Sequence, residues 1–319
     1  MKRFKKIILA IIIIIGLMAT WFIYNLYNSN APLTIGEHQR DIPFKGELSL
    51  DIYYPTTEVE GKSPVLMYVH GGAWIIGSKN ALNFDRFNGA INQLRDIGFT
   101  IICPDYTLAN NGKSPFPECI RDIYDAISWV KENATEYNLD LDRFGILGES
   151  AGAHISMLTV YNHERLLNED QLPIEVDYLI DAYGPTDLNG IYHSQTVEDL
   201  MRVISDWPGH LSECMDISRQ IFGFNPAADS IRAKAFMNKY SPIAHLHNGI
   251  PPTLIIQGDQ DKLVPFNQSV SLNQKMDDLG VSNSFHLLNG VDHAFADATE
   301  AQKDDIQKWI VEFVLKSYP

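Results

Sequence analysis

Short apolar runs alternate along the chain with longer segments whose apolar residues recur every three or four positions. The short runs are rich in Val and Ile and are bounded by Gly, Pro or Asp, as strands commonly are. The longer segments 117–134, 265–280 and 300–318 are predicted to be helices. Strands are predicted at 47–55, 63–72, 98–106, 143–150, 176–185, 251–261 and 282–293. This order predicts an α/β fold with a mostly parallel central sheet flanked by helices on both faces.

One long region, 186–248, interrupts this alternation. It contains irregular helical pieces and turns, but no segment with the composition of a strand. Long loops in compact domains are usually functional. We therefore expect a helical lid insertion at 186–248 within one domain that covers residues 31–319.

The first thirty residues have a different pattern, which is basic, then apolar, then polar. The uncharged run from 7 to 24 is near the minimum length for crossing a bilayer. The pattern favours an uncleaved membrane anchor within 1–30. Since the positive end should stay inside, a single-pass anchor would place the remaining chain outside the cytoplasmic membrane. Cleavage as a signal peptide, followed by secretion, is the alternative.

Charge and cysteine content narrow the choice of partners. The formal net charge is −15, although the N-terminal segment is basic. Nucleic-acid binding needs clustered Lys and Arg, so we expect no nucleic-acid partner. The three cysteines do not form a disulfide framework, although one pair remains an open alternative. Cys103 lies in an apolar strand and is predicted to be a small buried side chain. No cluster has the spacing of metal ligands.

The segment Gly148-Glu149-Ser150-Ala151-Gly152 follows a predicted strand and fits the pattern G-x-S-x-G. At a sharp strand-to-helix turn this pattern holds the serine in a strained conformation, where only small neighbours fit. It predicts that Ser150 is a nucleophile. A plain glycine-rich turn is the alternative.

A second glycine-rich segment, His70-Gly71-Gly72-Ala73, follows the strand predicted at 63–72. Attack by a serine on an acyl carbon generates an oxyanion that needs backbone N–H donors, and glycines permit their close approach. The segment fits an HGGG-type loop in which alanine replaces the third glycine. The alternative is a glycine turn beside a buried histidine.

A nucleophilic serine also needs a base and an orienting carboxylate. His293 follows the last predicted strand and is the favoured base, with His245 and His247 at the end of the insertion as weaker alternatives. His154 lies one turn beyond the serine and should face packing or the lid. Asp259 and Asp261 follow the strand at 251–261. Asp261 lies further into the loop and is the favoured acid, whereas Asp259 is expected to stabilise the turn.

Taken together, the segments "HGGAWIIGSK", "PDYTLA", "FGILGESAGAH", "GDQDKLVP" and "DHAF" resemble those of the alpha/beta hydrolase superfamily. More narrowly, they resemble the hormone-sensitive-lipase-like and bacterial esterase/lipase families, over residues 40–318. The resemblance implies an alpha/beta hydrolase fold and a serine carboxylic-ester hydrolase that forms an acyl-enzyme on a small or medium acyl ester, without metal or organic cofactor. A carbohydrate deacetylase or feruloyl-type esterase is the alternative. A non-enzymatic surface-binding protein on this scaffold is a lesser one.

The resemblance also assigns roles to residues. It implies a catalytic triad of Ser150, Asp261 and His293. It implies oxyanion donors at the amides of Gly71, Gly72, Ala73 and Ala151, although the alanine in HGGA leaves the donor set open. Apolar side chains of the insertion would contact an acyl group or form the lid's own core, and these are Tyr192, Met201, Trp207 and Phe222.

Overall fold

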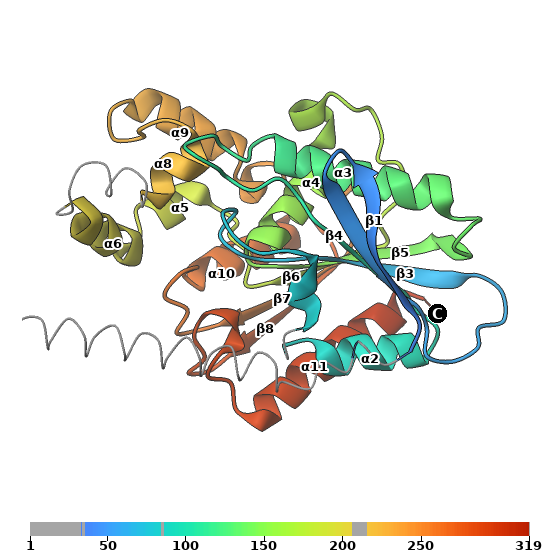
Figure 1. Cartoon of the computed structure of the whole chain (residues 1–319). Coiled ribbons are helices and arrows are strands. Elements are labelled where there is room, and N and C mark those ends of the chain that lie inside the picture. The colour runs from blue at the N-terminus through green and yellow to red at the C-terminus, as the bar shows by residue number, and fades with distance from the viewer. Residues whose placement is uncertain (1–32, 34–35, 84–85, 206–215, 319) are drawn as a thin grey trace, which may run out of the picture.

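The computed structural model describes Leu33 and residues 36–83, 86–205 and 216–318 (Figure 1). The predicted anchor at 1–30 lies outside these residues. Within them, no helix combines the length and the hydrophobicity needed to cross a membrane.

An eight-stranded sheet forms the centre of the molecule (Figure 1). Its order is β1-β2-β4-β3-β5-β6-β7-β8, and all neighbours from β4 to β8 are parallel, whereas β1 and β2 are antiparallel. The predicted mostly parallel sheet is therefore confirmed. The strands are β1 (His38–Lys45), β2 (Leu48–Tyr53), β3 (Ser63–Val69), β4 (Thr100–Pro104), β5 (Leu139–Glu149), β6 (Tyr178–Ala182), β7 (Thr253–Gly258) and β8 (Asn283–Leu288).

Helices cover both faces of this sheet (Figure 1). On one face lie α3 (Glu118–Asn133), α4 (Ala151–Leu167) and α10 (Asn267–Asp278). On the other face α2 (Asn88–Asp96) packs against α11 (Glu300–Lys316). The described residues also form the short 3-10 helices η2 (Lys79–Asn83), η3 (Pro242–Ala244) and η4 (His293–Phe295).

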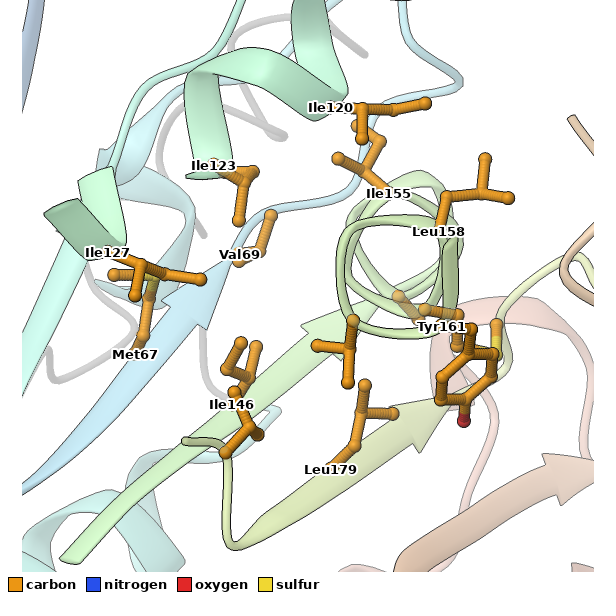
Figure 2. Close-up of a cluster of buried hydrophobic side chains, with 14 of the residues drawn as sticks. Met67, Val69, Ile120, Ile123, Ile127, Ile146, Ile155, Leu158, Tyr161 and Leu179 are labelled. Atoms are coloured by element: carbon orange, nitrogen blue, oxygen red, sulfur yellow. The ribbon is translucent and has the colours of Figure 1, made fainter. Parts of the chain in front are cut away.

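The strands are buried on both sides because helices cover both faces. In β3, Met67 and Val69 point into the layer beneath α3 and α4, whereas Leu66 and Tyr68 point into the opposite layer. Figure 2 shows the first layer, where isoleucines of α3, Ile155 and Leu158 of α4 and strand residues meet. Burying each such side chain contributes about 1.5–3 kcal/mol. Cys103 of β4 is fully buried and unpaired, which confirms its predicted place.

The described part of the region between β6 and β7 contains helices and no strand. Its helices are α5 (Leu188–Tyr192), α6 (Gln195–Ser205), α8 (Ile217–Phe222) and α9 (Ser230–Lys239). They gather at one end of the molecule (Figure 1). The Phe222 ring stacks on Phe236, and Phe236 meets Tyr240 edge-on. Tyr240 stacks on Phe116, which fixes the end of this region to the main body.

Candidate active site

Ser150 occupies the turn between β5 and α4. Its φ of 50° and ψ of −120° are rare for a residue with a side chain. A Cβ atom at Gly152 would overlap the carbonyl oxygens of Val69 and His70, and one at Gly148 would meet the backbone of Ala153 at 2.5 Å. The glycines of G-x-S-x-G are thus required by the crowding at this turn, which presents the serine at the carboxyl end of β5.

Three predicted residues meet at this end of the sheet. The Ser150 hydroxyl lies 3.1 Å from Nε2 of His293, and Nδ1 of His293 lies 2.7 Å from Oδ2 of Asp261. With a proton on Nδ1, the imidazole donates to the carboxylate and offers Nε2 as an acceptor to the hydroxyl. This is the geometry that activates a serine for attack on an acyl carbon.

Asp261 is held firmly by its own loop. Its Oδ1 accepts the amides of Leu263 at 2.9 Å and Val264 at 2.8 Å, and Oδ2 also accepts the Gln257 side-chain amide at 2.8 Å. Asp259 instead accepts the amide of Gly290 at 2.7 Å and ties together the loops after β7 and β8. The structure therefore places Asp261, and not Asp259, against His293.

The two other histidines near the glycine-rich segments have structural partners. His154 is fully buried, donates from Nε2 to the Tyr240 carbonyl at 2.7 Å and packs edge-on against Trp74. Burial lowers the pKa of His154 to about 3, so its ring is neutral. His70 donates to the Gly71 carbonyl at 2.7 Å and stacks on Tyr106.

The loop after β3 passes beside Ser150 in an unusual conformation. Gly72 has a φ of 125°, and a Cβ there would overlap the Ile76 carbonyl. Ala73 and Trp74 follow with φ values of 52° and 61°. Successive residues in such conformations can direct N–H groups into one concave site that suits an anion.

The four predicted oxyanion donors are not equivalent. The Gly71 amide already donates to Oε1 of Glu149 at 3.3 Å, whereas no hydrogen bond of Gly72 or Ala73 N–H to another described residue is present. Ala151 begins α4, where the first amides have no partner within the helix. Gly72, Ala73 and Ala151 are therefore better placed to donate to an oxyanion than Gly71.

A cavity of about 600 Å³ opens beside these groups and is lined mainly by apolar side chains. One wall is formed by Trp74 and Ile76 of the glycine-rich loop. The predicted Tyr192 and Phe222 line it, while Trp207 and the Met201 side chain lie outside the part of the structure that can be described. Most of the remaining apolar lining comes from the helical insertion and the Asp261 loop, with Leu188, Ile191, Val197, Ile217, Ile221, Leu263 and Val264.

Sequence reasoning missed two charged residues of this cavity. Arg86 and Glu149 form an ion pair of 2.7 Å and both line it. Glu149 occupies the second position of G-x-S-x-G, and a charged residue at the end of a buried strand was a usable signal. Arg86 had no comparable signal, because nothing in its surroundings marks it as a partner of a residue 63 positions away.

Comparisons with known proteins bear on the family and on the fold. The BD-FAE family model matches residues 50–276. "Esterase LipQ" of Mycobacterium tuberculosis is 26% identical over 299 residues, which are 89% of this chain and 65% of that protein. The chain thus spans somewhat less than two thirds of that relative.

Two solved structures share the architecture. A truncated carbohydrate esterase from gut microbiota has a TM-score of 0.66 at 22% identity and covers 88% of this chain and 97% of its own. LAE6, an alpha/beta hydrolase from the metagenome of Lake Arreo, has a TM-score of 0.64 at 19% identity and covers 88% and 82%. At these identities the likeness shows the fold, and the predicted alpha/beta hydrolase fold is confirmed.

Proposed function

The chain belongs to the BD-FAE family, and from this we propose that it is a serine carboxylic-ester hydrolase that works through an acyl-enzyme. The observation that carries the proposal is the continuous hydrogen-bonded series from Ser150 through His293 to Asp261. The turn around the serine admits only glycine at positions 148 and 152, and candidate oxyanion donors lie beside it. Because the curated relative extends beyond this chain, the activity is proposed on the site itself.

In the first half of the reaction, the Ser150 oxygen attacks the ester carbonyl carbon while Nε2 of His293 takes the hydroxyl proton. The oxyanion that forms accepts hydrogen bonds from the amides of Gly72, Ala73 and Ala151. The carbon–oxygen bond to the leaving alcohol then breaks, and His293 returns the proton to that alcohol. An acyl group remains on Ser150.

In the second half, His293 takes a proton from water, and the resulting hydroxide oxygen attacks the acyl carbon. Collapse of the second oxyanion releases the carboxylic acid and returns the proton to Ser150. Asp261 keeps the imidazole in the tautomer with a proton on Nδ1 and stabilises its charged form. The fixed donors to Asp261 hold that carboxylate in place throughout.

The apolar lining of the cavity favours a small or medium acyl ester. Most side chains around Ser150 offer no hydrogen bond to a sugar hydroxyl. A carbohydrate deacetylase or feruloyl-type esterase is the second candidate, because one structural neighbour is described as a carbohydrate esterase. A panel of p-nitrophenyl acetate, butyrate and octanoate with acetylated and feruloylated sugars separates the two. A preference of more than tenfold for the sugar esters would favour the second candidate.

We assign the insertion at 186–248 the role of a lid over this cavity. Its support is the set of cavity-lining residues from α5, α6 and α8, which include Ile191, Val197 and Phe222. Replacing Phe222 with alanine widens this wall, so that the ratio of octanoate to acetate hydrolysis should change by more than about threefold. An unchanged ratio would contradict the assignment.

For the N-terminal segment we propose a membrane anchor with the catalytic domain outside, and secretion after cleavage is the alternative. The support is the basic-then-apolar sequence of residues 1–30. Leu33 lies beside Arg95, which is in the last turn of α2 and near the amino ends of the parallel strands. Ser150 lies at the opposite end of the sheet, where these strands have their carboxyl ends. Fractionation of cells, followed by protease treatment of intact spheroplasts, distinguishes an exposed anchored domain from a released one.

A non-enzymatic role on the same scaffold is tested by chemical labelling. A fluorophosphonate reacts with a serine only where a base activates it. Labelling of Ser150, identified by peptide mass spectrometry, supports the enzyme. Failure to label Ser150 in folded protein would favour the binding protein.

A further inference from the structure

The carboxylate of Glu149 is a meeting point of four segments directly behind Ser150. Its Oε1 accepts the Tyr68 hydroxyl at 2.5 Å and the Gly71 amide at 3.3 Å. Its Oε2 accepts the Tyr183 hydroxyl at 2.6 Å. Arg86 donates to both oxygens, at 2.9 and 2.7 Å. The residue is only 2% exposed, so these donors replace water around the charge.

This carboxylate is ionised. Burial alone raises the pKa of Glu149, but the Arg86 guanidinium and the two tyrosine hydroxyls outweigh burial and hold the pKa below its usual value. A buried charge is tolerated when it is paired and fully hydrogen-bonded, as it is here. Removing one partner from such a pair leaves the other charge uncompensated.

Two of the donors connect Glu149 to the groups that perform the proposed reaction. The Gly71 amide belongs to the loop that carries the Gly72 and Ala73 donors. The Tyr183 ring lies edge-on to the His293 ring, with centroids 5.0 Å apart. Through these contacts the Glu149 carboxylate holds the loop that carries the oxyanion donors. It also holds the Tyr183 ring that packs against His293.

The charge of Glu149 also creates an electrostatic problem. Ser150 is the next residue, and the oxyanion forms beside it. An unneutralised carboxylate so close would oppose the developing negative charge, whereas Arg86 at hydrogen-bonding distance from both oxygens cancels its field. The pair therefore fixes the oxyanion loop without disfavouring the oxyanion.

We propose that Glu149 and Arg86 are a charge-balanced pair of positioning residues for ester hydrolysis, Glu149 by holding the Gly71 amide and Arg86 by neutralising Glu149. The inference rests on the proposed function, and it adds two residues that act through the oxyanion loop and not on the reacting ester. The predicted effect lies in turnover and not in substrate binding, since the apolar side chains that line the cavity are unchanged.

The test is a double-mutant cycle with Arg86→Gln, Glu149→Gln and the double variant, assayed on p-nitrophenyl butyrate. Active sites are counted by prolonged fluorophosphonate titration, so that a misfolded fraction does not count as lost turnover. Each single variant should lower kcat per titrated site about 10- to 100-fold, which is part of the loss expected for an oxyanion donor, and change KM less than about threefold. The double variant should recover at least about fivefold over the worse single variant, because the charges balance again.

Arg121→Gln is the matched control, because Arg121 of α3 forms another arginine–carboxylate pair, with Glu169 at 2.6 Å. It should keep kcat within about twofold. If Arg86→Gln does not fold, Arg86→Lys is used instead, because it keeps the charge. A kcat within about fivefold of the wild type supports the pair, and a loss beyond about fiftyfold contradicts it. Wild-type kcat in both single variants, or a double variant no better than the worse single one, overturns the inference. Failure of the wild type to hydrolyse any ester would instead sink the proposed function.

Discussion

Tyr106 donates its hydroxyl to the carbonyl oxygen of His70 at 2.9 Å, and the two rings stack 4.2 Å apart. This contact fixes the start of the glycine-rich loop. The preceding residue, Asp105, accepts the Lys79 amide at 2.9 Å and fixes the other end of the same loop. Asp105 and Tyr106, the two residues after β4, thereby explain why the loop keeps its strained conformation beside Ser150.

Loss of the Tyr106 hydroxyl should loosen this loop. Tyr106→Phe keeps the ring and removes one buried hydrogen bond, which leaves the His70 carbonyl without its donor and costs about 1–3 kcal/mol of unfolding free energy. We expect kcat on p-nitrophenyl butyrate to fall about 3- to 30-fold, because the oxyanion donors lose alignment. Urea denaturation measures the first quantity and steady-state kinetics the second. A variant that is destabilised but keeps full kcat would show that the contact serves folding alone.

The Gly72 position tests the loop from the other side. Gly72→Ala combines a φ of 125° with a Cβ that overlaps the Ile76 carbonyl, so the loop must move. We expect kcat/KM to fall about 10²- to 10³-fold, as for a lost oxyanion donor. Gly46→Ala is the control, since Gly46 also has positive φ but meets nothing within 4 Å. Equal activity in the two variants would remove the loop from the mechanism.

Asp261 and Asp259 offer a matched pair of substitutions two residues apart. Asp261→Asn removes the charge that holds the His293 tautomer, and kcat should fall about 10⁴-fold, as in other serine triads. Asp259→Asn disturbs only the turn that includes Gly290 and should lower kcat less than about threefold. The assignment of the acid fails if Asp259→Asn is the more damaging of the two.

The buried His154 predicts a pH dependence of stability. Its pKa is about 3 in the folded state, well below the 6.5 of an ordinary histidine, because burial disfavours the charged ring. The unfolded chain therefore binds the extra proton first, and this group's stabilising contribution is complete above about pH 6.5 and is lost as pH falls toward 3. At pH 5 the slope from one such group is about 1.4 kcal/mol per pH unit.

His154→Gln should remove that slope, since glutamine can still donate to Tyr240 and does not titrate. Urea denaturation at pH 5, 6 and 7 compares the two proteins, and their difference isolates His154 from other groups, such as His70. As pH falls, the unfolding free energy of the wild type should decrease more steeply than that of the variant, by the slope expected for one extra proton bound on unfolding. Parallel stability curves would mean that His154 is solvated or already charged.

Much of the site was predictable because its signals are local. G-x-S-x-G at a strand end predicted Ser150, and the crowding around Gly148 and Gly152 explains why the motif takes this form. Asp261 and His293 were predictable because the alternation of strands and helices brings strand ends to one edge of the sheet. The serine needed only its neighbours in the sequence, whereas the acid and the base also needed the order of the predicted strands.

What escaped prediction depends on pairing across long distances. Strand β1 contains charged and largely exposed residues, and it is a strand because it pairs with β2 at the edge of the sheet. Its composition alone does not favour that state. The contact of Glu149 with Arg86 and Gly71 likewise joins segments 63 and 78 residues apart. For the same reason the sequence could not separate Gly71 from the other predicted oxyanion donors.

The most direct test of the account compares hydrolysis of p-nitrophenyl butyrate by the wild type and by Ser150→Ala, both shown to be folded by circular dichroism. We predict that turnover by the wild type exceeds the spontaneous rate and that the variant loses at least about 10⁴-fold, down to the residual rate supplied by binding and the oxyanion donors. Equal rates for the two proteins would contradict the claim that Ser150 is the nucleophile.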